Sequence, residues 1–162
     1  MSCSGGCQCG AVRFRVEGAL GEASICHCRM CQKATGGFFG PYVTVATSDL
    51  VWTRGEPKRF QSSNKVQRGF CGDCGTPLTF EYESKHIGLA IGAFDRPGDI
   101  RIAEQLASTA ALPFLADLAG LPVHAQDEPR AAAHLASIAS YQHPDYDTEV
   151  WPPTGDGAMA GG

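Results

Sequence analysis

The chain has 162 residues, of which 43% are hydrophobic and 19% charged, so it can bury a core and is not a disordered, tail-like protein. The formal net charge is −4 and no lysine- or arginine-rich block occurs, so a nucleic-acid partner is not expected. The 20 glycines and 10 prolines favour short strands and turns over a helical bundle.

Alternation predicts a half-buried strand over residues 10–16, with apolar side chains on one face and Arg13 and Arg15 on the other. Residues 26–31 are expected to form a turn or one helical turn, which ends at the glycines that follow. Short strand-like runs separated by turn residues come next, over 38–45, 50–53, 58–61, 66–70, 78–82 and 86–93. These elements predict a mainly β, antiparallel domain over residues 1–103.

The composition changes beyond this domain, where alanine and leucine become frequent. Residues 104–151 are expected to form a short Ala-rich, helical or irregular extension that packs on the same domain. Within it, Asp127 could cap a helix that places Leu135 and Ile138 on one face. Residues 152–162 are small residues and turn formers, which predicts a flexible tail.

Eight cysteines are the most informative feature of the composition, and all lie within the first 74 residues. The start of the chain has no charged and apolar segments of the kind found in secretory signals, so a disulfide-stapled secreted domain is not expected. The apolar stretch 107–123 is interrupted by two prolines and an aspartate, so no membrane span is expected. Thiolates bound to metal in a reducing cytoplasm explain the cysteines better, and a homodimer is compatible with the sequence.

Cys71 and Cys74 are separated by two residues and lie at the ends of a predicted tight turn, where both sulfurs could chelate one ion. Cys7 and Cys9 form a shorter half-site, because side chains at i and i+2 of an extended segment point the same way. A glycine follows each pair, as a knuckle turn with positive φ requires. The two pairs together predict a structural Cys₄ zinc site that joins the N-terminus to the middle of the sheet.

Two alternatives to this site remain open. Cys71 and Cys74 could form a redox dithiol, although the alternating helices and strands of thioredoxin-like folds are missing. Cys3 competes for the N-terminal half-site, because its spacing to Cys7 also suits chelation. If Cys9 is the ligand, Cys3 is a free thiol.

Cys26, Cys28 and Cys31 bring three thiols together, with no obvious fourth ligand. A structural zinc site is closed, whereas a catalytic one keeps a position for water or substrate, so this cluster predicts a second, catalytic zinc. His27 would point away from both neighbours in an extended segment, so it is expected to face outward or to pack in the core. A closed structural zinc and metal-free thiols are the alternatives.

Three ordered cysteine motifs resemble the glutathione-dependent formaldehyde-activating enzyme family, which shares its domain with centromere protein V. The motifs are Gly6-Cys-Gln-Cys-Gly10, Cys26-His-Cys-Arg-Met-Cys-Gln-Lys33 and Arg68-Gly-Phe-Cys-Gly-Asp-Cys-Gly75. The resemblance covers roughly residues 3–100, and the Ala- and Leu-rich stretch 103–126 departs from it. It implies an Mss4-like fold of coiled antiparallel β-sheets stapled by zinc.

The resemblance also implies two zinc ions per chain. The ligands it implies are Cys7, Cys9, Cys71 and Cys74 for the structural zinc, and Cys26, Cys28 and Cys31 for the catalytic zinc. The implied activity is of the carbon–sulfur lyase type, in which formaldehyde and glutathione join as S-hydroxymethylglutathione.

Cations near the second cluster would offset its thiolate charge and attract the carboxylates of glutathione. The candidates for substrate binding are Arg29, Lys33 and Arg68, and further partners for the carboxylates are Lys58, Arg59 and Arg96. Two functions of other classes stay open, namely a non-catalytic zinc module that binds a protein partner and a thiol sensor that releases zinc on oxidation.

Overall fold

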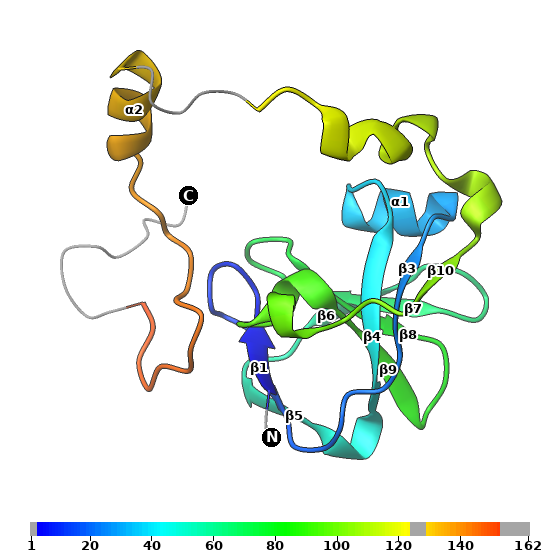
Figure 1. Cartoon of the computed structure of the whole chain (residues 1–162). Coiled ribbons are helices and arrows are strands. Elements are labelled where there is room, and N and C mark those ends of the chain that lie inside the picture. The colour runs from blue at the N-terminus through cyan, green and yellow to red at the C-terminus, as the bar shows by residue number, and fades with distance from the viewer. Residues whose placement is uncertain (1–2, 124–128, 153–162) are drawn as a thin grey trace.

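The protein is mainly β, as the sequence predicts, and its computed structural model describes residues 3–123 and 129–152. A three-stranded sheet has the order β1-β2-β5 and consists of β1 (Cys3–Gly6), β2 (Arg13–Val16) and β5 (Leu50–Arg54). A seven-stranded sheet has the order β10-β3-β4-β9-β8-β7-β6 (Figure 1). Its strands are β3 (Ala23–Cys26), β4 (Gly40–Ala46), β6 (Lys58–Gln61), β7 (Gln67–Phe70), β8 (Pro77–Glu81), β9 (His86–Ala90) and β10 (Glu104–Leu106).

Helices are few and short in the described part of the chain. The α-helices are α1 (Arg29–Thr35) and α2 (Pro129–Ala136). The 3₁₀ helices are η1 (Thr47–Asp49), η2 (Ile91–Ala93), η3 (Pro97–Asp99), η4 (Ser108–Ala110) and η5 (Pro113–Gly120). None of the helices in the described ranges is long and apolar enough to cross a membrane.

The core collects one face of each sheet, because side chains alternate between faces along a strand. Phe14 of β2 is fully buried and packs edge-on against Trp52 and Phe94, with ring centroids 6.0 and 5.1 Å apart. Val43 of β4 lies opposite Leu89 of β9, and both are fully buried in the same cluster. The intervening residues of β4 and β9 therefore point to the opposite face of the seven-stranded sheet.

The extension beyond residue 103 begins with a strand that the sequence analysis did not predict. β10 pairs with β3, and the pairing is parallel in an otherwise antiparallel sheet. The amide of His27 donates to the carbonyl of Leu106, at 3.0 Å, and so continues the ladder beyond β3. The main chain of β3 would otherwise have one unpaired edge, and three residues of the extension satisfy it.

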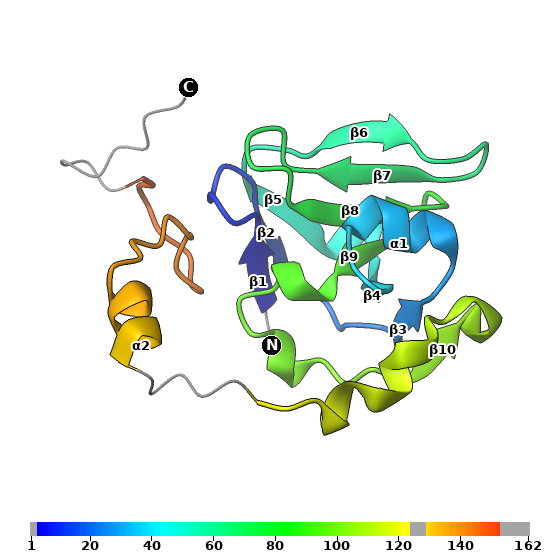
Figure 2. The ribbon, with the colours of Figure 1, turned by 90° about the horizontal axis from the view of Figure 1, so that it is seen from above.

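The helix predicted in the extension is present as α2, and Pro129 is its first residue. Its expected cap, Asp127, lies outside the described residues, as does all of the predicted tail beyond Pro152. Leu135 is half exposed, and Ile138 lies beyond the end of the helix and is more exposed still. Accordingly α2 lies apart from both sheets in Figures 1 and 2.

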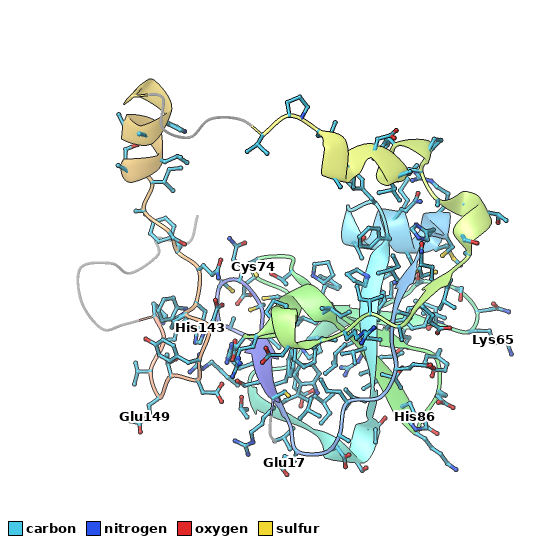
Figure 3. All side chains as sticks on the ribbon, viewed as in Figure 1. Glu17, Lys65, Cys74, His86, His143 and Glu149 are labelled. Carbon is cyan, nitrogen blue, oxygen red and sulfur yellow. The ribbon has the colours of Figure 1, made fainter. Side chains whose placement is uncertain are left out.

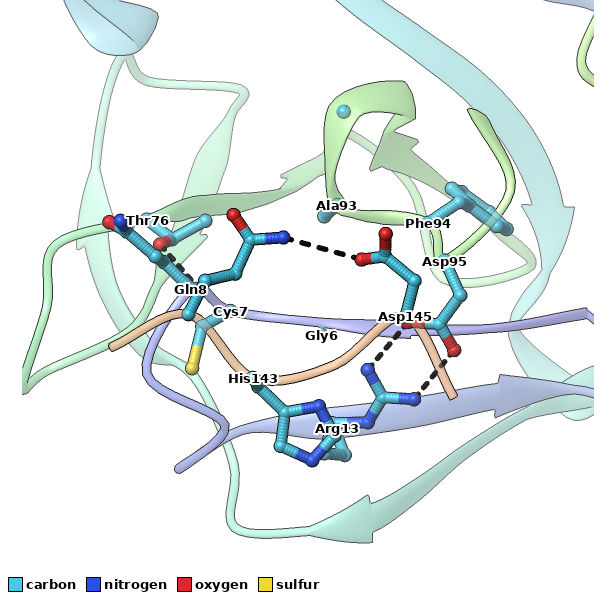
Figure 4. A pocket seen from close by; sticks show the side chains of 12 residues that line it. Gly6, Cys7, Gln8, Arg13, Thr76, Ala93, Phe94, Asp95, His143 and Asp145 are labelled. Carbon is cyan, nitrogen blue, oxygen red and sulfur yellow. Dashed lines mark hydrogen bonds and ion pairs between the residues drawn. The ribbon is translucent and has the colours of Figure 1, made fainter. Parts of the chain in front are cut away.

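Arg13 contradicts the expectation that the arginines of its strand face outward, because it is only 3% exposed. Its guanidinium donates to both carboxylate oxygens of Asp95, at 2.6 and 2.7 Å (Figure 4). It also donates to Asp147 at 2.7 Å. Ser4 adds a hydrogen bond to Asp95 at 2.5 Å. Although burial acts in the opposite direction, the hydrogen bonds from Arg13 and Ser4 lower the pKa of Asp95. Asp95 thereby neutralises the buried arginine, and Asp147 of the C-terminal segment adds a second, more exposed carboxylate.

We expect the substitution Asp95→Asn to destabilise the protein by about 3 kcal/mol at pH 7, because it removes the main counter-charge of a buried guanidinium. The pKa of Asp95 is lower in the folded than in the unfolded chain, so its contribution is present above the unfolded value, about 3.9, and is lost as pH falls through the folded value. Urea unfolding of wild type and variant between pH 7 and pH 3 should show the difference shrinking at the acid end.

The matched control is Asp99→Asn, because Asp99 forms an exposed ion pair with Arg96. Exposed pairs contribute little, so this control should unfold almost as the wild type does. Equal unfolding curves for Asp95→Asn and Asp99→Asn at pH 7 would contradict the role assigned to the buried pair.

Candidate metal centres

Four sulfurs from two distant segments converge at one place. The Sγ atoms of Cys7, Cys9, Cys71 and Cys74 all lie within 4.8 Å of one another. Cys9 Sγ is 3.5 Å from Cys7 Sγ and 3.8 Å from Cys71 Sγ. Zinc–sulfur bonds of about 2.3 Å at tetrahedral corners place sulfurs roughly 3.8 Å apart, so the donor set and its spacing fit a Cys₄ metal site.

The N-terminal half of this site is a turn, and the extended segment expected from the sequence is absent. The amide of Gly10 donates to the carbonyl of Cys7, at 3.1 Å, and the amide of Val12 donates to Cys7 Sγ at 3.2 Å. Gly10 has φ of 75°, as the glycine after the pair was expected to have. The turn brings Cys7 and Cys9 together by curling the chain around the sulfurs.

The second half of the site repeats this geometry between β7 and β8. The amide of Gly75 donates to the carbonyl of Cys71, at 3.0 Å, and the amide of Asp73 approaches Cys71 Sγ at 3.4 Å. Gly75 has φ of 79°. Amides that point at a sulfur stabilise the thiolate, which is the form that binds metal.

The pKa values of two thiols in this cluster are shifted in opposite directions. Burial raises the pKa of Cys7 far above its usual range. Although burial also acts on Cys74, the hydrogen bonds from Thr76 and Cys9 lower the pKa of Cys74 to about 6. Several thiolates cannot share so small a volume without a cation, so this chemistry also favours a bound metal. Cys3, the competing ligand, lies in β1 outside the cluster.

The C-terminal segment covers the N-terminal turn, a contact that no pattern in the sequence predicted. Trp151 Nε1 donates to the carbonyl of Cys9 at 2.7 Å, and the amide of His143 donates to the carbonyl of Gln8 at 2.7 Å. A Cβ atom at Gly10 would lie 2.4 Å from the His143 ring and 2.5 Å from Trp151, so only glycine fits. Figure 3 shows Cys74 and His143 at the same end of the molecule.

The second cluster joins the end of β3 to α1. The Sγ atoms of Cys26, Cys28 and Cys31 all lie within 4.8 Å of one another. Cys28 caps α1, and its sulfur accepts from the amide of Cys31 at 3.4 Å. The predicted helical turn is a seven-residue helix, which ends at Gly36 with φ of 67° as expected. Gly40 lets α1 approach β4, since a Cβ there would lie 3.0 Å from Cys31 Cβ.

No fourth His, Cys, Asp or Glu joins this cluster among the residues that the structure describes. His27 is 2% exposed, and its Nε2 lies 2.9 Å from Gln105 Oε1 of β10. Its ring also packs edge-on against Phe39, at 5.8 Å between centroids. Of the two positions expected for His27, outward-facing or packed in the core, the structure shows the second. Its contact with Gln105 connects the cluster to the extension.

Of the three predicted substrate-binding cations, Arg68 contacts a cluster sulfur. Its Nη2 donates to Cys31 Sγ at 3.3 Å, its Nη1 to the Tyr42 hydroxyl at 2.9 Å and its Nε to Ser62 at 3.0 Å. Arg68 is 3% exposed, and its guanidinium also lies 4.8 Å from the centroid of Phe80. A buried guanidinium with no carboxylate partner in the described chain places its positive charge next to the thiols.

The other two cations lie on α1 and face solvent. Arg29 donates to Gln32 Oε1 at 2.8 Å, and Lys33 is exposed. Two of the further candidates are engaged elsewhere, because Arg59 pairs with Glu81 at 3.0 Å and Arg96 pairs with Asp99 at 2.8 Å.

A groove of about 350 Å³ opens beside the second cluster. Cys26 and Cys31 form part of its wall, together with residues from β3, β4, β8, β9 and β10 and their flanking loops. The lining residues are Glu22, Ser24, Cys26, Cys31, Tyr42, Thr44, Phe80, Tyr82, Gly88, Glu104 and Leu106. Two residues of the three-thiol cluster therefore line a space large enough for a small molecule.

Comparison with known proteins finds a family and a similar fold. The family profile described as glutathione-dependent formaldehyde-activating enzyme matches residues 2–109. A Rhodobacter sphaeroides protein of known crystal structure has a similar fold, with a TM-score of 0.51 and 24% sequence identity. That similarity covers 63% of this chain and 98% of the other. A comparison with curated proteins gives no match.

We expect about two metal ions per chain in protein purified without chelators, one for each cluster. Cys74→Ser should unfold or strongly destabilise the protein, because binding at a closed site contributes folding energy. Cys28→Ser should lose one metal and keep the fold. Elemental analysis and far-UV circular dichroism measure both effects.

The control for this pair is Cys3→Ser, since Cys3 belongs to neither cluster. This variant should retain both metals and the wild-type spectrum. Equal loss of secondary structure in Cys28→Ser and Cys74→Ser would show that both clusters are structural.

Proposed function

The chain belongs to the glutathione-dependent formaldehyde-activating enzyme family, and we propose that it is a zinc-dependent enzyme of the carbon–sulfur lyase type. Its substrates would be a small thiol of the glutathione kind and a small aldehyde. The enzyme would join them as a hemithioacetal, or cleave the hemithioacetal into the two. Zinc in the four-thiol cluster would be structural. Zinc held by Cys26, Cys28 and Cys31 would be catalytic.

The observation that carries this proposal is the difference between the two clusters. The first cluster has four thiols, which complete a tetrahedron, whereas the second has three. The groove lies beside the second cluster, with Cys26 and Cys31 in its wall. A tetrahedral ion held there would present its remaining position to a ligand from outside the protein.

The proposed reaction is the addition of a thiol to the carbonyl group of an aldehyde. The thiol sulfur adds to the carbonyl carbon, a carbon–sulfur bond forms, and the thiol proton passes to the carbonyl oxygen; cleavage is the reverse. Zinc, when bound, would lower the pKa of a substrate thiol so that a thiolate is present at neutral pH. The protein residues would bind the tail of the thiol and keep the two reactants close together.

Arg68 has a role in this proposal that differs from carboxylate binding. Three thiolates and one divalent ion carry a formal charge of −1, and the arriving thiolate makes it more negative. Arg68 donates to Cys31 Sγ from a buried position, so its charge offsets that of the cluster. Arg29 and Lys33 do not line the groove, so we propose for them only contact with parts of a substrate that extend beyond it.

A location in the cytoplasm is part of the same proposal. All eight cysteines are free of disulfide bonds, and seven of them belong to the two clusters. Thiols that hold metal need a reducing surrounding to stay reduced. A non-catalytic zinc module or a redox sensor would not require the groove beside the second cluster, so the enzyme is the better-supported function.

The proposal predicts that glutathione adds a thiolate to the second cluster. With Co²⁺ in place of Zn²⁺, the sulfur-to-cobalt charge-transfer bands report how many thiolates bind each ion. Glutathione should strengthen these bands, whereas S-methylglutathione should not, because its sulfur cannot become anionic.

Cys31→Ala should abolish the response and serves as the control for binding at the second cluster. Bands that are unchanged by millimolar glutathione, with both metals still bound, would count against glutathione as the thiol. Zinc release by peroxide with no response to any thiol would favour the redox sensor instead.

The role of Arg68 has its own test. Arg68→Met should weaken metal binding at the second cluster by about tenfold or more, as loss of an outer-shell partner does. It should also move the charge-transfer bands to lower energy, because Cys31 loses a hydrogen-bond donor. Arg68→Lys should restore part of both effects. Arg59→Met, which removes an exposed ion pair, should leave the bands in place.

A further inference from the structure

The groove beside the second cluster occupies the non-core face of the seven-stranded sheet. Alternation places Tyr42 and Thr44 of β4 on this face, because Val43 and Val45 point into the core. Ser24 lies opposite Tyr42 and Glu104 lies opposite Ser24, so neighbouring strands contribute side chains in register. The unpredicted strand β10 therefore supplies part of the groove.

The charged groups in this groove are all acidic. Glu22 and Glu104 line it, and no lysine, arginine or histidine is among its lining residues. Neither glutamate forms an ion pair within the described part of the chain. Arg68 lies beneath the surface, with its three hydrogen bonds already formed. A carboxylate in the groove would meet two like charges and no free cation.

Aromatic rings form the wall on the side of β8. Phe80 packs against Tyr42 and Tyr82, with centroids 5.5 and 5.7 Å away. The guanidinium of Arg68 lies 4.8 Å from the Phe80 centroid, so this wall already interacts with one cation from below. Ring faces attract cations and not carboxylates. The aromatic side of the groove thus favours a cationic group, as the two glutamates do.

We propose, on the basis of the proposed function, that the groove selects thiols with a cationic tail, of the aminothiol class. The sulfur would lie at the Cys26 and Cys31 end, and the ammonium group between the two glutamates and the aromatic wall. Glutathione has a net negative charge, with two carboxylates and one ammonium group, so we expect this groove to bind it more weakly than a thiol with a cationic tail. The charge of the tail decides the preference, since the hydroxyl groups that line the groove, from Ser24, Tyr42, Thr44 and Tyr82, are neutral and can bind a tail of either sign.

Three thiols with the same two-carbon chain test this proposal on the full-length, cobalt-loaded protein. They are 2-(trimethylammonio)ethanethiol, 2-mercaptoethanol and 2-mercaptoethanesulfonate, whose end groups are positive, neutral and negative. Titration of the charge-transfer bands at low salt should give affinities in that order. The spread should narrow at high salt, because the two glutamates are exposed and screened.

The double variant Glu22→Gln, Glu104→Gln isolates the contribution of the groove. It should reduce the affinity ratio of the cationic to the anionic thiol about tenfold, as two partly exposed charges would. Differences in intrinsic thiol acidity cancel in the comparison with wild type. The matched control is Glu56→Gln, an exposed glutamate that does not line the groove, and it should leave the ratio unchanged.

The possible outcomes separate the charge preference from the proposed function. Tighter binding of the anionic thiol, or a ratio that the double variant leaves unchanged, overturns the charge preference and leaves the proposed enzyme function standing. If no thiol changes the cobalt bands, the proposed function fails, and the preference fails with it.

Discussion

Four sulfurs that must share one small volume are the constraint on which the rest of the fold depends. Cys7 and Cys9 belong to the segment after β1, and Cys71 and Cys74 to the turn between β7 and β8. Their convergence ties the edge of the three-stranded sheet to the far part of the seven-stranded sheet. Because a closed metal site contributes folding energy directly, short strands of four or five residues can be sufficient around it.

The same constraint explains how the C-terminal segment finds its place. The Cys7–Gly10 turn exposes carbonyl groups that its own short loop cannot satisfy. Trp151 and the amide of His143 supply the missing donors. The guanidinium of Arg13, three residues after this turn, donates a hydrogen bond to Asp147 of the same segment. Local satisfaction of polar groups therefore holds a distant part of the chain against the four-thiol cluster.

The second cluster shows what a three-thiol site requires from its surroundings. Its sulfurs need a positive neighbour, which β7 supplies as the buried Arg68. A groove lies beside them, which β4, β8 and β10 help to build. His27 connects the cluster and the groove, since it lies between two of the cysteines and pairs with Gln105 of β10. The three-thiol cluster and the groove are thus assembled by the same contacts.

The sequence by itself determined the mainly β character and the three-thiol cluster, since alternation and the close spacing of Cys26, Cys28 and Cys31 are local properties of the chain. It predicted the four-thiol cluster from two spaced pairs but left Cys3 in competition with Cys9, and only the folded chain places Cys9 with Cys71 and Cys74. It also determined the positive φ of Gly10 and Gly75, which a turn around two sulfurs demands. The sequence suggested an outward Arg13 and an extended Cys7–Cys9 segment, and the structure contradicts both.

Only the tertiary structure decided the features that depend on partners far away along the chain. The burial of Arg13 requires Asp95 and Asp147, which lie 82 and 134 residues away. The strand β10 forms because β3 has an open edge to pair with. The three residues of β10 have no sequence pattern that would predict a strand. The charge of the groove depends on that pairing, because Glu104 lines the groove only when β10 lies beside β3. Local periodicity carries no information about which edge is left unpaired, and the long-range hydrogen bonds that settle it form only in the folded chain.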